Sequence, residues 1–374
     1  MVQIVDTATL IYEDKNLDIQ ELKENIENIL GLKPLKEKEI DKIVFRVQGQ
    51  NGFRYINFIS LIKLRKNIRI SITFSYSRYK SNSNYELCDN EKTVNKINSE
   101  IAKLFKLITL KPITVKKLKV SAIDISNQLE VENIRSYYKC NDLIYRALRQ
   151  TETNGRLYFD TAEDRRKVLD GLDFREQNKK RREANSYFKI YSKRKEEEQT
   201  GKQTKGHTTA LRGELTLKGA FLKRQGLEMA EGINRNNLDR ILYNTLANVL
   251  AEGIEKELNF SITHLAKLLQ ENGTRKIREL LIINEHHIFD AKILDIILTP
   301  EILGVSDRQC RTYKKQVKET LQVIENSGEI KKVFTGNFER LTKLIKKVVK
   351  AEMTFNFTEK GVVVKWEKLQ SKQK

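Results

Sequence analysis

Three short segments of this chain alternate between apolar and polar residues, and this alternation restricts the fold more than any other feature. They span residues 121–126, 187–193 and 211–218. Because successive side chains of a β-strand point to opposite faces, each segment predicts a strand with one apolar and one polar face. An antiparallel sheet with one solvated face explains the pattern best.

The two faces of this predicted sheet differ sharply in chemistry. The apolar face carries Ile123, Ile125, Phe188, Ile190, Leu211, Leu215 and Leu217. The polar face carries Asp124, Tyr187, Lys189, Tyr191, Lys193, Arg212, Glu214, Thr216 and Lys218. Phenols, carboxylates and cations together suit phosphodiester chemistry, but tyrosine is also a common strand residue and most solvated faces are catalytically inert.

The charge of the chain indicates a polyanionic partner. Its 374 residues include 70 Lys and Arg against 50 Asp and Glu, which gives a net charge of +20 spread along the whole sequence. Nucleic acid is the expected partner. No apolar run approaches the length that spans a bilayer, so a membrane partner is not expected.

The cysteines and the N-terminus both suggest an intracellular protein. Cys88, Cys140 and Cys310 are far apart in the sequence and odd in number, which favours reduced thiols over a disulfide framework or a zinc site. Residues 1–15 lack the basic and apolar regions of a signal peptide. We therefore expect a cytoplasmic location.

Strands and helices alternate in the first part of the sequence, and helices dominate the second. The patterns predict strands at 1–12, 41–48, 53–64 and 68–76, and helices at 17–31, 91–107 and 131–149. Later helices are predicted at 236–257, 262–280, 285–298, 300–326 and 337–351, before a hairpin at 353–366. The fold class is therefore α+β, with an antiparallel-sheet domain at 1–225 and a mainly helical domain at 226–374.

Short motifs give the polar face a more specific meaning. They are Ile123-Asp124, Tyr191-x-Lys193-x-x-Glu196 and Arg212-x-Glu214-x-x-x-Lys218, followed by Leu222-Lys223-x-x-Gly226-Leu227. In this order they resemble the replication initiators of filamentous bacteriophages, the gene II proteins, and more loosely the transferase-type rolling-circle initiators of plasmids. Outside residues 124–227 the resemblance is only one of general layout.

The resemblance implies a nuclease that nicks one strand of duplex origin DNA. Tyr191 matches the family nucleophile, which keeps the 5′ phosphate and leaves a 3′ hydroxyl for a polymerase. Asp124, Glu196 and Glu214 match acidic positions that would hold Mg²⁺ or Mn²⁺, metals that prefer oxygen ligands. Glu196 lies in a run of three glutamates that a solvated loop would explain equally well. The implied partners are double- and single-stranded origin DNA, a host helicase and a host polymerase.

A tyrosine nucleophile must lose its proton, and the cations of these motifs would favour its ionised form or bind the phosphate. A tyrosine with a reference pKa of about 10 is only ~0.1% ionised at pH 7, a deficit of roughly 4 kcal/mol. Lys193 on the strand of Tyr191 would favour the phenolate, while Arg212 and Lys218 would hold phosphate oxygens or balance carboxylates. Tyr187, on the same strand face, is a second nucleophile, a residue that stacks on a base, or a residue that covers the sheet.

Two departures from common patterns limit these expectations. The family commonly has arginine before the Ile-Asp pair, and here that residue is Ala122, so Lys119 or Arg212 would have to supply its contact. Many rolling-circle nucleases bind metal through a His-hydrophobe-His motif. The four histidines, His207, His264, His286 and His287, contain no such motif, so we expect none to be a ligand.

A basic helix in the second part is a candidate DNA-binding element. Ser306 is placed to cap a helix that carries Arg308, Arg311, Lys315 and Lys318 on one face. This spacing is typical of the second helix of a helix-turn-helix, with the 353–366 hairpin as a wing. A solvated basic face on a packing helix explains the spacing equally well.

Two other functions remain open from the sequence. A non-enzymatic initiator that binds origin repeats through winged-helix domains would share the size, charge and helical C-terminal part, but would not need Tyr191. A relaxase or transposase-like nickase would use the same residues on a different DNA substrate. The sequence does not distinguish a monomer from a homodimer, or a phage from a plasmid.

Overall fold

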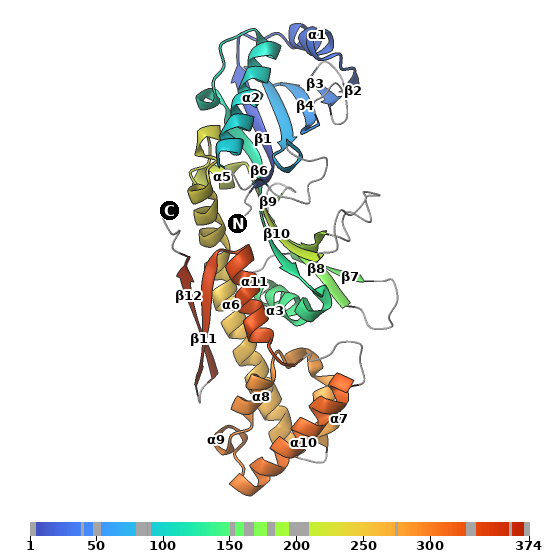
Figure 1. Cartoon of the computed structure of the whole chain (residues 1–374), viewed down its shortest axis with the longest axis vertical. Helices are drawn as coiled ribbons and strands as arrows, with labels where there is room; N and C mark the ends of the chain where they lie inside the picture. The colour runs from blue at the N-terminus through green and yellow to red at the C-terminus, as the bar shows by residue number, and fades with distance from the viewer. Residues whose placement is uncertain are drawn as a thin grey trace. The chain divides into compact units, whose positions relative to one another are not determined.

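The computed structural model in Figure 1 shows a mixed fold of a large, mostly antiparallel sheet and several helices, as the α+β prediction requires. It describes residues 5–38, 41–47, 54–79, 88, 91–149, 154–160, 168–177, 184–193, 209–273, 276–326, 334–358 and 361–369. Among these residues, no helix is both long enough and apolar enough to cross a lipid bilayer.

Two compact units interleave along the sequence. The first unit contains Met1–Gln128, Arg175–Phe188 and Gly213–Leu242, and the second contains Leu129–Phe174, Lys189–Arg212 and Tyr243–Lys374. Four strands, β6 (Lys119–Val131), β8 (Val168–Gln177), β9 (Ala184–Ser192) and β10 (Thr209–Lys218), contribute residues to both units. The functional boundary expected between residues 225 and 226 stays a prediction.

The described strands of the large sheet run in the order β2-β3-β4-β5-β1-β6-β10-β9-β8-β7. The remaining strands are β1 (Val5–Asp14), β2 (Pro34–Lys38), β3 (Lys42–Arg46), β4 (Ile56–Lys63), β5 (Ile68–Ser75) and β7 (Asn154–Asp160). The pairs β2–β3, β3–β4, β4–β5, β5–β1 and β1–β6 are antiparallel. The three strands predicted to form one sheet, β6, β10 and β9, are neighbours in this order.

Helices α1 (Ile19–Leu30) and α2 (Glu91–Thr109) cover one face of the sheet in the first unit. The Asp18 side chain caps α1 by accepting hydrogen bonds from the backbone N–H groups of Gln20 and Glu21. Both helices bury one apolar stripe and expose charged residues on the other side, which is the pattern of a helix that packs on a core.

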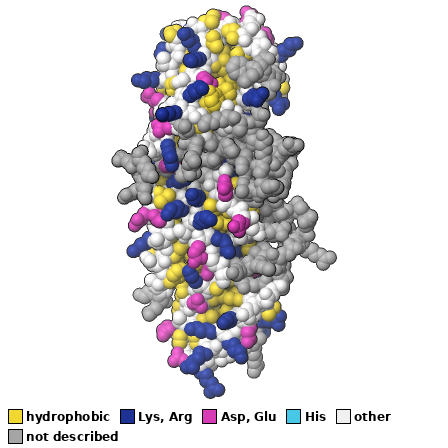
Figure 2. All heavy atoms as spheres, viewed as in Figure 1, with side chains coloured by type: hydrophobic (Ala, Val, Ile, Leu, Met, Phe, Trp, Pro, Cys, Tyr) yellow, Lys and Arg dark blue, Asp and Glu magenta, His cyan; other side chains and the backbone are white. Residues whose placement is uncertain are grey.

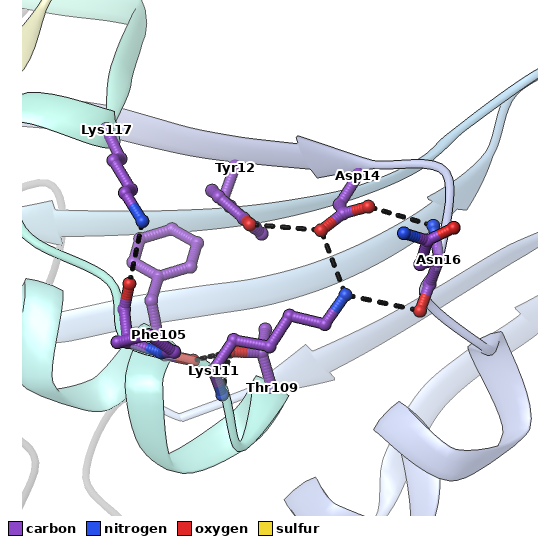
Figure 3. Close-up of polar contacts among 8 residues, drawn as sticks. Tyr12, Asp14, Asn16, Phe105, Thr109, Lys111 and Lys117 are labelled. Carbon is purple, nitrogen blue, oxygen red and sulfur yellow. Dashed lines mark hydrogen bonds and ion pairs between the residues drawn. The ribbon is translucent and has the colours of Figure 1, made fainter.

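A polar cluster fixes the end of α2 to the end of β1, as Figure 3 shows. Lys111 Nζ donates to Asp14 Oδ2 at 2.9 Å and to the backbone oxygen of Asn16 at 3.2 Å. Tyr12 donates to the same carboxylate at 3.2 Å. The backbone N–H of Asn16, then Lys111, lower the pKa of Asp14 below its usual value, so the ion pair holds at neutral pH.

Helices dominate the second unit. After α3 (Tyr138–Arg149), the 38-residue helix α6 begins in the first unit at Arg235 and continues to Asn272. Shorter elements complete the chain: α5 (Ala220–Arg224), α7 (Ile277–Ile283), α8 (Ala291–Ile297), α9 (Pro300–Leu303), α10 (Asp307–Asn326), α11 (Asn337–Val348), β11 (Ala351–Thr358) and β12 (Gly361–Lys368). The hairpin of β11 and β12 is the predicted C-terminal hairpin.

A buried carboxylate joins two of these helices. Asp290 caps α8 through the backbone N–H of Lys292 and accepts a second bond, 2.7 Å long, from the backbone N–H of Asn337. The Asn337 side chain in turn donates to the backbone oxygen of Phe289 at 2.6 Å. These bonds satisfy backbone donors at the starts of α8 and α11 that no intrahelical partner can reach.

Candidate functional site

The first unit brings one predicted acidic residue into contact with the neighbouring strand. Ile123 and Ile125 of β6 and Leu215 and Leu217 of β10 are buried, as the alternation predicts. Asp124 is therefore on the opposite face, and its Oδ1 accepts a hydrogen bond of 2.6 Å from the hydroxyl of Thr216 in β10. A short bond to an ionised carboxylate holds that side chain in one orientation.

The polar face is not uniformly solvated, and in this respect the sequence-based prediction is wrong. Lys193 and Arg212 are fully buried, and Glu214 is 5% exposed. Asp124, Lys189 and Tyr191 are half-buried, whereas Lys218 is exposed. The alternation correctly separated two faces, but it cannot show that part of the polar face is covered as well.

Tyr191 lies at the partly exposed end of β9 in the second unit, with a cation against its ring. The Lys189 ammonium is 4.8 Å from the centre of the Tyr191 ring. An ammonium in this position is attracted to the π-electrons of the ring. Lys193, the cation predicted from the sequence to act beside Tyr191, is fully buried instead. The spacing of two residues between Lys189 and Tyr191 on one strand face could have identified Lys189 instead.

Lys193 and Arg212 also belong to the second unit, and neither is without a partner. A fully buried cation is stable only when paired, because removing a charge from water costs several kcal/mol. Their burial favours structural pairing over direct contact with a phosphate on the surface. The phosphate-binding role expected for Arg212 stays a prediction.

The predicted site residues divide between the two units. Asp124, Glu214 and Lys218 belong to the first unit, and Tyr191 belongs to the second. The side chain of Tyr187 and all of Glu196 lie outside the described residues. That these groups act at one centre stays a prediction.

That the predicted carboxylates hold a divalent cation stays a prediction. Within the described ranges, no three His, Cys, Asp or Glu side chains are grouped as ligands of one ion. Mg²⁺ is usually held by only one or two carboxylates, with water and substrate phosphates completing its shell. Asp124 and Glu214 would supply such a pair, and the Thr216 bond already orients Asp124.

The basic helix predicted in the second part is α10. Ser306 caps it reciprocally with Gln309: the Gln309 N–H donates to Ser306 Oγ at 3.4 Å, and the Ser306 N–H donates to Gln309 Oε1 at 3.1 Å. Cys310, Tyr313 and Val317 bury the opposite side of α10. All four cations of the predicted DNA-binding face are exposed: Arg308, Arg311, Lys315 and Lys318.

The C-terminal hairpin is not placed beside α10 as a wing would be. Asn259 of α6 exchanges two hydrogen bonds with the backbone of Val362, and Glu255 accepts from the backbone N–H of Val364. Tyr313 of α10 instead donates to the backbone oxygen of Leu269. The hairpin therefore contacts α6 at residue 259, whereas α10 contacts it at residue 269. At 1.5 Å per residue these two contacts are about 15 Å apart along α6.

The exposed cations of α10 give a first testable prediction. If they contact phosphates, replacing Arg308, Arg311, Lys315 and Lys318 with glutamine lowers the log–log salt slope of DNA binding by up to about 3.6, at about 0.9 per phosphate. A matched control replaces four exposed lysines of α2 and leaves the slope within about 0.9 of the wild type: Lys92, Lys96, Lys103 and Lys106. Equal salt slopes for the two variants would show that the basic face of α10 is solvated and contacts no phosphates.

Three of the four histidines meet in the second unit, which the sequence did not predict. The ring centres of His264 and His287 are 4.7 Å apart, and those of His286 and His287 are 4.0 Å apart. Phe260 stacks on His264 with ring centres separated by 5.8 Å. Because His264 is on α6 and the others follow α7, only the tertiary packing brings them together.

This histidine cluster predicts lower stability in mild acid. Burial, then the charges of His286, His264, Arg146 and Lys139, lowers the pKa of His287 to about 4. The unfolded chain binds a proton near pH 6.5, so the free energy of unfolding falls as the pH drops from about 6.5 to 4. Since the ring is partly solvated, we expect a loss of about 1 kcal/mol. Urea titrations at pH 7.5 and 4.5 measure it.

The matched variant for this prediction is His287→Gln, which keeps a polar side chain but cannot bind a proton. Its unfolding free energy should fall less than that of the wild type over the same pH range. A parallel loss in both proteins would show that other groups cause the acid sensitivity.

Comparison with known proteins does not assign this chain to a family. No protein-family profile matches it, and no curated protein matches it. Among solved structures it is similar to the crystal structure of the di-domain ARO/CYC BexL from the BE-7585A biosynthetic pathway, at 7% sequence identity. The match covers 66% of this chain and 96% of that chain, with a TM-score of 0.19. A score this low carries no inference about fold or function.

Proposed function

We propose that this chain is a rolling-circle replication initiator, a site- and strand-specific DNA endonuclease and strand transferase. The sheet-containing part up to residue 225 would be the nuclease, and the helical part from residue 226 would bind DNA or a protein partner. The net charge of +20 suits a polyanionic partner. On the face that Figure 2 shows, Lys and Arg side chains are spread among Asp and Glu rather than gathered in one patch. The resemblance of the 124–227 motifs to filamentous phage initiators agrees with this function.

The observation that carries the proposal is the environment of Tyr191. The phenol is partly exposed at the end of a strand, with the Lys189 ammonium 4.8 Å from its ring centre. A tyrosine nucleophile needs both accessibility to a DNA strand and stabilisation of its phenolate.

The reaction forms one bond to phosphorus and breaks another. The Tyr191 oxygen loses its proton and attacks the scissile phosphorus, and the bond from phosphorus to the 3′ oxygen breaks. The 5′ phosphate stays on the tyrosine, and the 3′ oxygen leaves as a hydroxyl after gaining a proton. Attack by a 3′ hydroxyl on the phosphotyrosine reverses these steps and rejoins a strand.

Asp124 and Glu214 would hold Mg²⁺ or Mn²⁺ in this scheme. When bound, such an ion polarises a phosphoryl oxygen and supplies several kcal/mol of charge stabilisation. The Thr216 hydroxyl donates a 2.6 Å hydrogen bond to the Asp124 carboxylate and so holds this side chain in one orientation. Lys218, which is exposed at the end of β10, would contact a phosphate.

Incubation with a supercoiled plasmid that carries the cognate origin tests the proposal. In Mn²⁺ we expect a nicked circle and a covalent protein–DNA adduct, and in EDTA we expect neither. Peptide mapping of the adduct should locate the linked residue at Tyr191. A protein that binds the origin in Mn²⁺ without any adduct would contradict the nuclease function.

The proposal also specifies partners and context. The 3′ hydroxyl would pass to a host polymerase, and a host helicase would unwind the duplex in the cytoplasm of a bacterial cell. A phage and a plasmid origin, and a monomer and a homodimer, are all compatible with the chemistry.

The second candidate is a non-enzymatic protein that binds origin repeats. The exposed basic face of α10, with its reciprocal cap, favours this function. The position of the hairpin, about 15 Å along α6 from α10, does not favour the winged-helix form of it. A relaxase or transposase-like nickase would share the Tyr191 chemistry and differ in its DNA substrate.

A further inference from the structure

Among the described residues of the first unit, helices α1 and α2 cover one face of the sheet and no helix covers the other. Residues facing α1 and α2 are completely buried, including Leu10, Phe45, Ile59, Ile70 and Ile72. Their neighbours in sequence point the other way. Most of those are half-buried or exposed, so we call this side the open face.

The register of the strands arranges the open face in rows that cross the sheet. One row runs from β3 to β6 through directly paired residues: Arg46, Phe58, Thr73, Thr9 and Ala122. The next row is Val44, Ser60, Ser71, Ile11 and Lys119. Five strands with four intervals of about 4.8 Å give a row roughly 19 Å long.

An exposed aromatic ring stands beside a cation in the first of these rows. Phe58, the third residue of β4, is 41% exposed. Its directly paired neighbour on β3 is the exposed Arg46. A planar ring next to a guanidinium offers a surface on which a base can stack while its phosphate is neutralised.

The charges of the open face complement a polyanion. Lys42, Arg46, Arg69 and Lys119 contribute four positive charges, and Glu13 contributes one negative charge. Glu13 is engaged by Arg69 at 2.6 Å and by Lys119 at 3.6 Å. The net charge of these five side chains is therefore three positive charges.

The polar and apolar residues of this face are mixed, which argues against a protein partner. Thr9 and Thr73 join their hydroxyls at 2.9 Å in the centre of the face. Toward β5 and β1, the hydroxyl residues Thr73 and Thr9 follow Phe58 in its row, and Ser60 and Ser71 separate Val44 from Ile11 in the next. Apolar residues therefore alternate with hydroxyl residues across the face, unlike the apolar core that protein interfaces bury. Hydroxyl donors, cations and an aromatic ring together suit a sugar–phosphate chain with exposed bases.

The open face also continues toward the candidate site. Ala122 pairs with Thr9, and Asp124 follows Ala122 by two residues on the same side of β6. A strand of DNA lying along the row of Phe58 would therefore approach the carboxylate that Thr216 holds.

We propose that the open face binds single-stranded DNA, with one base stacked on Phe58 and phosphates contacting Arg46, Lys42 and Lys119. This inference rests on the proposed function, because a nuclease that transfers strands must hold the strand that it has nicked. It adds the surface that would hold that strand.

The test uses a fluorescein-labelled 15-nucleotide oligothymidylate and the full chain in EDTA, where no cleavage occurs. We expect Phe58→Ala to weaken binding about tenfold in fluorescence anisotropy, because one stacked base is lost. We expect Arg46→Gln to weaken binding and to lower the log–log salt slope by about 0.7, the value for one phosphate of a single strand. A duplex of the same length, whose bases are already stacked, should respond less to Phe58→Ala.

Phe357→Ala is the matched control, because Phe357 is also 41% exposed, on β11. Lys365→Gln is the control for charge, because Lys365 is exposed on β12. Circular dichroism should show that all four variants fold as the wild type does. The inference is overturned if the wild type does not bind the oligonucleotide, or if Phe58→Ala binds it no more weakly than Phe357→Ala.

These outcomes are independent of the nuclease function. Binding that depends on Phe58 in a protein that never forms a DNA adduct would support the open face and contradict the nuclease. Adduct formation with unchanged oligonucleotide binding in Phe58→Ala would contradict the open face alone.

Discussion

Tyr191→Phe is expected to abolish nicking and covalent capture of origin DNA while leaving origin binding unchanged. Phenylalanine keeps the ring against which the Lys189 ammonium lies, at 4.8 Å, and removes only the oxygen that attacks phosphorus. Loss of the attacking oxygen should reduce the rate of nicking by at least ~10⁴-fold. Nicking of supercoiled plasmid and gel-shift binding, measured on the same preparation, separate the two effects.

Tyr145→Phe provides a matched control for this variant. Tyr145 is also half-buried in the second unit, and a cation, the Arg149 guanidinium, is 5.8 Å from its ring centre. It should nick DNA at the wild-type rate. Tyr187→Phe distinguishes the second tyrosine, and we expect it to keep the first cleavage. A covalent adduct formed by Tyr191→Phe would exclude Tyr191 as the nucleophile.

Gly253→Ala is expected to destabilise the second unit by about 2 kcal/mol. A Cβ atom at Gly253 of α6 would lie 2.5 Å from the backbone oxygen of Ala147 in α3, well inside van der Waals contact. Overpacking of this kind costs up to about 3 kcal/mol. The better helix propensity of alanine returns only about 1 kcal/mol. Chemical denaturation measures the difference.

Helix propensity and packing predict opposite changes in stability for this variant. Propensity alone predicts that Gly253→Ala stabilises the protein, whereas the close approach of α3 predicts the opposite. Gly232→Ala is the control, because its Cβ would meet two side-chain ends and no backbone atom: Leu227 Cδ1 at 3.3 Å and Asn237 Nδ2 at 4.0 Å. Ala147→Gly should not rescue Gly253→Ala, since the clash is with a backbone oxygen. An unchanged or higher stability of Gly253→Ala would show that α3 and α6 are further apart.

The local patterns of the sequence predict much of this fold. The alternation at Leu211, Leu215 and Leu217 correctly placed these three leucines on one buried apolar face of β10, because successive side chains of a strand point to opposite faces. The Ser306 cap was also correctly placed, since a cap depends on residues three positions apart. Strands β2, β7 and β8 were not predicted, because residues 33–38 and 151–180 show no clear period.

Features that depend on packing could not be predicted in the same way. The sequence suggested a break near residues 258–261, where Asn259 and Ser261 are weak helix formers, but α6 continues through them. Buried neighbours such as Leu258 and Ile262 stabilise the helix there. The burial of Arg212 and the meeting of His264 with His287 likewise depend on residues distant in the sequence.

The chain passes between its two units at residues 128, 174, 188, 212 and 242, so neither unit is one continuous stretch. No single cut of the polypeptide can therefore release either unit with all of its residues. A truncation at residue 225 removes Gly226–Leu242 from the first unit together with most of the second. Function is best dissected in this protein by point substitution in the intact chain, because deletion would damage both halves at once.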